Sequence, residues 1–265
     1  MFVLPTKTRY FPRNLAIAST RGEGVHEFLV VWNHEYASLV KILETFSKHE
    51  AKVILAHSQL EEATGMVVGT FYCGLAKPDR DSDAIRDEIK GLSFVQTVES
   101  ASTEQSLFDK FLFPVTIWGS HRVLVMRLSP MLNIENRLVK ELGSVGSAIM
   151  FREGEGYAAE TLKQYREVLG SITTESLLEN VKDGLRATGW GLFEFKKTKD
   201  GYEVTVQEAA AVQGPTEPSR FLCGIIAGIL ESVYATKVMV VESTIDLKSG
   251  TVFVKLSKAS DGSAV

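Results

Sequence analysis

The side chains most able to do chemistry in this 265-residue chain are two cysteines and five histidines. Cys73 and Cys223 lie in different halves of the chain, so they predict no disulfide framework and favour a reducing compartment. The histidines show no i,i+4 pair or other spacing typical of a metal site. The sequence also has no G-x-S-x-G motif, no phosphate-binding P-loop and no compact Ser/His/Asp group. No catalytic residue is therefore assigned, although groups far apart in a chain can meet in a fold.

One glycine motif could suggest a nucleotide. Gly154–Ala159 has the G-x-G-x-x-A spacing of a dinucleotide-binding turn. Such a turn needs a strand before it and no negative charge facing the pyrophosphate. Glu153 and Glu155 flank the first glycine and would repel that group. We therefore expect no nucleotide here, and no cofactor elsewhere.

Aromatic side chains in the second half could instead bind an apolar ligand. Small-molecule pockets are mostly apolar, with a few polar groups that orient the ligand. Trp190 and Phe221 would supply ring faces, and His121 or Tyr165 a hydrogen bond. Each of these side chains could also be an ordinary core residue. The candidate ligand-binding residues are Trp118, His121, Tyr165, Trp190, Phe221 and Cys223.

The elements that would position these residues fall into two groups. Residues 26–101 contain four apolar strand-like runs and two amphipathic helices, in the order βαββαβ. Leu39, Ile42, Leu43 and Phe46 recur at helical spacing in the first helix. This order predicts a ferredoxin-like α+β domain.

The segment Val30–Leu43 resembles the first strand, loop and helix of ACT domains. Leu39, Ile42 and Leu43 match the helix of that family, and Tyr36 and Ala37 stand where it has Pro-Gly. The resemblance implies an effector loop containing Asn33, His34 and Ala37. A glycine there would let an effector approach the backbone, whereas Ala37 adds a methyl group. We therefore expect weak or no affinity for free amino acids.

The second half predicts a mixed α/β domain. We expect strands at 115–118 and 122–128, then helices at 129–142, around 162–169 and at 175–188. A hairpin at 192–206, an apolar helix at 221–233 and a last hairpin at 238–256 follow. Gly224 and Gly228 lie on one face of the apolar helix, which favours close packing of its backbone against a neighbour.

Three segments of this half resemble landmarks of the 4-vinyl-reductase domain family: Gly189–Glu194, Cys223–Glu231 and Val238–Ser243. The resemblance implies a domain that holds small apolar or aromatic molecules, as in phenol-type sensors. Many members bind zinc through several cysteines. Cys223 matches the first, but the later positions fall on Ile245 and Thr251, which do not ligate zinc. We therefore predict no metal.

The expected organisation is an N-terminal extension (1–25), an ACT-like domain (26–104), a 4-vinyl-reductase-like domain (105–258) and a flexible tail (259–265). The net charge of −4 and pI of 5.8 argue against nucleic-acid binding. No apolar run is long enough to span a bilayer, and no signal peptide is recognised. We expect a cytoplasmic protein. We also expect a homodimer, because exposed strand edges need cover.

The sequence thus favours a regulatory protein that senses a small apolar or aromatic molecule and has no DNA-binding element of its own. A regulatory protein partner would then transmit the response. Two alternatives remain open. One is an enzyme or reductase accessory factor acting on a bulky apolar substrate, and the other is a structural dimeric adaptor.

Overall fold

The computed structural model describes residues 16–18, 24–61, 64–76, 78–103, 106–108, 111–112, 115–117, 121–210 and 217–259. The chain divides into two compact units, Met1–Val115 and Thr116–Val265. The expected domain boundary lay between residues 104 and 105. In the first unit a short strand, β1 (Ala16–Ala18), pairs with β6 (Ser106–Phe108). The second unit also contains a two-stranded pair, β7 (Thr116–Ile117) with β8 (His121–Arg122).

The first unit is built around a four-stranded antiparallel sheet of order β3-β4-β2-β5. Its chain order is β2 (Gly24–Asn33), α1 (Ser38–Lys48), β3 (Lys52–Glu61), β4 (Met66–Leu75), α2 (Pro78–Lys90) and β5 (Val95–Thr103). This βαββαβ order, with the first and third strands in the centre, is the ferredoxin-like arrangement. The predicted fold class of the first half is therefore confirmed.

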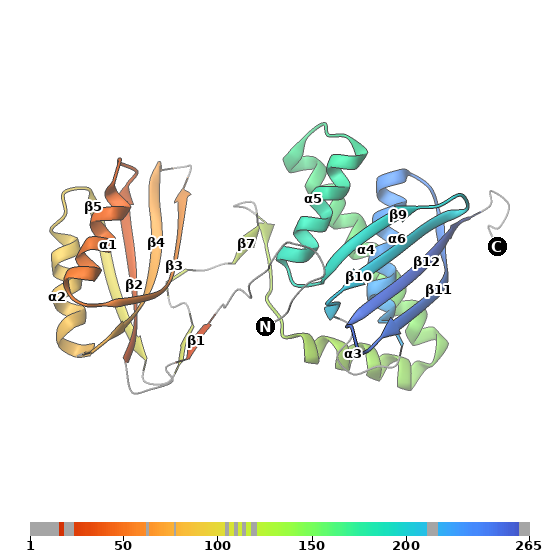
Figure 1. Ribbon diagram of the computed structural model, residues 1–265, viewed down its shortest axis with the longest axis horizontal. Helices are drawn as coiled ribbons and strands as arrows, with labels where there is room; N and C mark the ends of the chain where they lie inside the picture. Colours follow the sequence, from red (N-terminus) through yellow and green to blue (C-terminus); the bar gives the residue numbers. More distant parts are fainter. Residues whose placement is uncertain are drawn as a thin grey trace. The chain divides into compact units, whose positions relative to one another are not determined.

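Both helices of this unit cover one face of the sheet (Figure 1). Their apolar stripes bury Ile42 and Phe46 from α1, and Ile85 and Ile89 from α2. The Phe46 ring packs against Phe28 and Phe71 on the two central strands, with ring centroids 5.3 and 5.2 Å away. This core holds the β2–α1 loop in place, since it anchors the elements on both sides of that loop.

The second unit has a four-stranded antiparallel sheet of order β11-β12-β10-β9. Its strands are β9 (Leu192–Lys197), β10 (Gly201–Gln207), β11 (Val238–Asp246) and β12 (Thr251–Lys258). Alternate residues of β12, including Val252, Val254 and Leu256, are buried, while Phe253 between them is exposed. One face of the sheet is therefore apolar and covered, and the other faces solvent.

Four helices complete this unit: α3 (Leu128–Leu142), α4 (Ser144–Leu169), α5 (Thr174–Ala187) and α6 (Arg220–Tyr234). Helices α4 and α6 lie against one face of the sheet (Figure 1). Leu222 to Leu230 of α6 are all buried, which explains why this helix is apolar nearly all round. Together these elements give a mixed α+β unit, as the sequence predicts.

Helices α4 and α6 approach so closely that only glycine fits at three positions. A Cβ atom added to Gly154 or Gly224 would meet a backbone carbonyl oxygen of the facing helix, that of Phe221 or Phe151 respectively. A Cβ at Gly228 would lie 2.8 Å from the Glu155 carbonyl oxygen. The close packing predicted for Gly224 and Gly228 is therefore present, and its partner is α4.

Two predictions for this half were wrong in detail. Residues 123–127 form no strand, and the nearest strand, β8, ends at Arg122. Leu124 is 89% exposed, so no strand of the described residues covers its side chain. Helix α3 begins at Leu128, before the predicted start, and α4 follows at once from Gly143. The Gly154–Ala159 motif consequently lies inside a continuous helix, not in a phosphate-binding turn.

Candidate functional site

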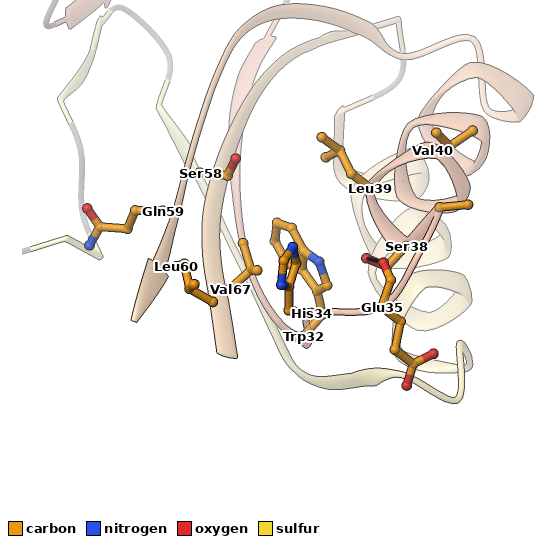
Figure 2. A pocket seen from close by; sticks show the side chains of 11 residues that line it. Trp32, His34, Glu35, Ser38, Leu39, Val40, Ser58, Gln59, Leu60 and Val67 are labelled. Carbon is orange, nitrogen blue, oxygen red and sulfur yellow. Dashed lines mark hydrogen bonds between the residues drawn. The ribbon is translucent and has the colours of Figure 1, made fainter. Parts of the chain in front are cut away.

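An open cavity of about 340 Å³ lies at the β2–α1 loop of the first unit. Figure 2 shows its wall, with Ser58, Gln59 and Leu60 from β3 and Ser38, Leu39 and Val40 from the first turn of α1. Apolar and polar side chains share this wall. The lining residues are Trp32, His34, Glu35, Ala37, Ser38, Leu39, Val40, Ser58, Gln59, Leu60 and Val67.

The backbone at Ala37 shapes this cavity. Ala37 precedes α1 in the left-handed conformation, with φ 63°, and gives the helix no side-chain cap. Instead, the Ser38 hydroxyl donates to the Glu35 carbonyl oxygen at 2.9 Å, which closes the turn before the helix. An alanine therefore occupies a backbone conformation that favours glycine.

The structure brings two of the three predicted loop residues to the cavity. His34 and Ala37 line it, and the His34 side chain is exposed. Asn33 is occupied elsewhere, because its Oδ1 accepts a hydrogen bond from Gln96 Nε2 at 3.0 Å. Asn33 thus ties the end of β2 to β5.

In the second unit, three aromatic rings meet at the start of α6. The Trp190 and Phe221 rings stack with centroids 5.8 Å apart and an interplanar angle of 29°. Tyr157 of α4 contacts both, at 6.1 Å from Trp190 and 6.0 Å from Phe221. Trp190 and Phe221 are half-buried and Tyr157 is 42% exposed. We call this group the aromatic triad.

The local sequence explains how Trp190 reaches the triad. It lies between Gly189 and Gly191, which have φ values of 86° and 136° that other residues rarely adopt. The Trp190 backbone N–H donates to the Leu185 carbonyl oxygen, and its own carbonyl oxygen accepts from Ala210 N–H at 3.0 Å. The turn after α5 is therefore tied on both sides and holds the indole against α6.

The other predicted ligand-binding residues lie apart from the triad or cannot be placed. Tyr165 is buried on α4, with its hydroxyl end over Gly184 of α5. Cys223 belongs to α6 and is fully buried in the core of the second unit. His121 is partly exposed on β8. Trp118 lies outside the described residues.

The Cys223 thiol is not arranged as a nucleophile. Burial raises its pKa to about 11, although the nearby Arg220 and a hydrogen bond with Ser243 act in the opposite direction. At neutral pH it therefore stays protonated and unreactive. In the described parts of the chain, no group of three or more His, Cys, Asp or Glu residues could hold a metal ion.

Sequence reasoning missed Tyr157. It belongs to the segment treated as a possible nucleotide turn, which hid its place on a helix. The usable signal was its spacing of three from Gly154, which puts both residues near one face of a helix. Because Gly154 brings the α6 backbone close, Tyr157 lies within ring contact of Phe221.

Comparison with known proteins found no matching family model and no matching curated protein. Among solved structures, the ACT domain of GTP pyrophosphokinase from Chlorobium tepidum matches 30% of this chain and 99% of that domain. Its identity is 14% and the TM-score is 0.27. The phenol-responsive sensory domain of the transcription activator PoxR, solved with phenol, matches 53% of this chain and 78% of that domain. Its identity is 13% and the TM-score is 0.42. The neighbours thus include an ACT domain and a sensory domain.

Within the described ranges, no helix has both the length and the hydrophobicity needed to cross a bilayer. Helix α6, the most apolar helix, has 15 residues, fewer than the roughly 20 that a membrane span requires.

Proposed function

We propose that this protein is a regulatory protein that senses a small apolar or aromatic molecule through its second unit. The observation that carries the proposal is the aromatic triad. A half-exposed cluster of rings, held by a glycine-flanked turn, offers stacking surfaces to a planar ligand. The largest apolar patch on the surface of a monomer is often a binding site.

The triad also limits what can bind. Its rings already contact one another at about 6 Å, so no cation or ring fits between them. A ligand would therefore stack on the outer, exposed side. This favours a planar molecule such as a phenol over a quaternary ammonium ion, which needs an open cage.

The proposal also covers the domain organisation, the cellular location and the oligomeric state of the protein. We assign residues 26–104 to an ACT-like domain and 105–258 to a domain of the 4-vinyl-reductase type. The two buried, unbridged thiols fit a reducing compartment, which favours the cytoplasm. We further propose a homodimer that passes its response to a protein partner.

The test is a search for a bound molecule. Mass spectrometry of the denatured protein would identify a copurified ligand, and a thermal-shift screen would cover phenols, fatty acids and tetrapyrroles. A ligand that binds only the folded state adds about 2.7 kcal/mol at a hundredfold excess over Kd. We expect phenols to raise the melting temperature.

The alternatives give different outcomes in the same experiment. If a bound molecule is converted to a product during incubation, the protein is an enzyme or accessory factor instead. If no compound copurifies and none shifts the melt, the sensor proposal fails and the adaptor gains support.

A further inference from the structure

A second cavity, of about 320 Å³, lies in the second unit where α6 begins beside α4. Its wall combines apolar groups with charged ones. Phe151 and Ala148 supply the apolar part, and a serine hydroxyl adds a hydrogen-bonding group. The lining residues are Ser147, Ala148, Phe151, Arg152, Glu155 and Arg220.

Two guanidinium groups in this wall have weak carboxylate partners or none. The Arg220 guanidinium lies 3.9 Å from a carboxylate oxygen of the exposed Glu217, which is the far limit of an ion pair. Arg152 makes no ion pair with any residue in the described parts of the chain. Since a guanidinium offers five N–H donors in a planar fork, both groups can bind a carboxylate.

Arg220 is fixed at the cavity by a buried network. The carboxylate of Glu135, which is 6% exposed, accepts a hydrogen bond from the Arg220 backbone N–H at 2.5 Å. It also accepts from the Ser219 hydroxyl at 2.6 Å, and Ser219 in turn caps α6. The start of α6 is therefore tied to α3, and hydrogen bonds hold the backbone from which the Arg220 side chain extends.

Two acidic side chains near the cavity, Glu135 and Glu155, would repel an anion to different extents. Glu135 is already satisfied by α6, while Glu155 lines the cavity one turn beyond Phe151. Burial and the nearby Glu231 carboxylate raise the pKa of Glu155, and Lys237 and Arg152 oppose this. The wall thus carries two guanidinium groups and one carboxylate, an excess of positive charge that suits a ligand with a single carboxylate.

We propose that this cavity binds a small monocarboxylate with an apolar body. The carboxylate lies between Arg152 and Arg220, and the body packs on Phe151 and Ala148. This site is distinct from the aromatic triad, because it recognises a charged group and none of its lining residues belongs to the triad. A ligand here bridges α4 and the start of α6.

The test is a ligand-observed NMR titration of the full chain with cyclohexanecarboxylate and with cyclohexanecarboxamide, which has the same body without the charge. The body is not aromatic, so stacking on the triad does not contribute. We expect the carboxylate to bind and the amide not to bind. Arg152→Gln and Arg220→Gln should each weaken binding about tenfold, equivalent to 1.4 kcal/mol. Glu155→Gln should tighten it.

Lys163→Gln is the matched control, because it removes one positive charge from exposed α4 surface outside the cavity. Its affinity should equal that of the unmodified chain. Circular dichroism would establish that each variant is folded. The proposal is overturned if carboxylate and amide bind equally, or if neither binds. It is also overturned if the arginine variants match Lys163→Gln, or if Glu155→Gln binds no better.

Discussion

At the scale of single residues, two alanines adopt a backbone conformation that normally favours glycine. Ala37 precedes α1 with φ 63°, and Ala235 follows α6 with φ 50°. The left-handed conformation costs a residue with a Cβ roughly 1–2 kcal/mol. Glycine avoids that cost but loses about 0.5–1 kcal/mol more in entropy on folding. We therefore predict that Ala37→Gly stabilises the protein by about 0.5–1 kcal/mol, measured by urea unfolding.

The same substitution tests the cavity of the first unit. Without the methyl group, an amino acid can approach the loop backbone, so calorimetry should detect tighter binding in Ala37→Gly than in the unmodified chain. Ala235→Gly is the control, because it relieves similar strain far from the loop in sequence. If both variants bind amino acids equally, the methyl group of Ala37 is not what limits affinity.

Glu88 of α2 forms hydrogen bonds with the end of α1, and we expect their contribution to stability to depend on pH. Its carboxylate accepts from Lys48 Nζ at 2.8 Å and lies 2.9 Å from His49 Nε2. The hydrogen bond from Lys48, followed by that from His49, lowers the pKa of Glu88 from its usual 4.5. A carboxyl whose pKa falls on folding stabilises the protein above that usual value. The contribution is lost as the pH falls through the lower pKa of the folded state.

Glu88→Gln should therefore lower the melting temperature at pH 7 but not in acid below the folded-state pKa. Glu179→Gln is the control, since it removes the same charge from an exposed pair with Lys182 on α5. Its melting temperature should change little at any pH. A Glu88→Gln deficit that persists unchanged into acid would contradict the assignment.

The residues of the site were only partly predictable. Trp190 and Phe221 could be named because they fall in or beside segments that resemble those of the 4-vinyl-reductase family. Tyr157 could not, because its role depends on the distance between two helix backbones. That distance is set by glycines 70 residues apart in sequence, Gly154 and Gly224. The spacing of one helix does not reveal which other helix it faces.

At the scale of elements, the α4–α6 contact is the most demanding feature of the second unit. Gly154→Ala would drive a Cβ into the Phe221 carbonyl oxygen, and backbone cannot move away as a side chain can. Overpacking of a rigid core costs typically 1–3 kcal/mol and sometimes more. We predict that Gly154→Ala lowers the free energy of unfolding by at least about 2 kcal/mol.

Gly156 provides a control on the same helix. A Cβ there meets nothing within 4 Å, so Gly156→Ala should stabilise α4 by roughly 0.5–1 kcal/mol. The two variants add one methyl group each, two positions apart, and should shift the urea midpoint in opposite directions. Equal shifts would mean that the helices are not packed as closely as described.

The elements themselves were largely predictable, because apolar periodicity decides them locally. The ferredoxin-like order and the hairpins of the second unit follow from such patterns. The prediction for residues 122–128 was wrong because an apolar run forms a strand only where a partner strand lies beside it, and the run itself does not reveal a partner. The continuous helix α4 was missed because Gly154 and Gly156 suggested a turn, whereas close packing explains the first of them.

At the scale of the whole molecule, an exposed sheet edge in the first unit favours self-association. Strand β3 is an edge of its sheet and exposes Ile54 and Leu60, and the β2–α1 loop exposes Tyr36. Long apolar edges pair with other chains unless they are protected. We predict a homodimer, so light scattering should give about twice the 29.2 kDa chain mass. Leu60→Lys should reduce the mass measured by light scattering. A chain that is monomeric at micromolar concentration would contradict the prediction.

Binding of an aromatic molecule at the triad of the second unit can be observed by ¹⁹F NMR. Labelling with 5-fluorotryptophan gives one probe for each of the three tryptophans, and Trp190→Phe assigns the Trp190 signal. Titration with phenol should shift that signal saturably. Phe221→Ala should abolish the shift, and Phe253→Ala, which removes a 46% exposed ring from the other face of the sheet, should leave it intact. A Trp190 signal that does not respond to phenol, or responds equally in both variants, would contradict the account.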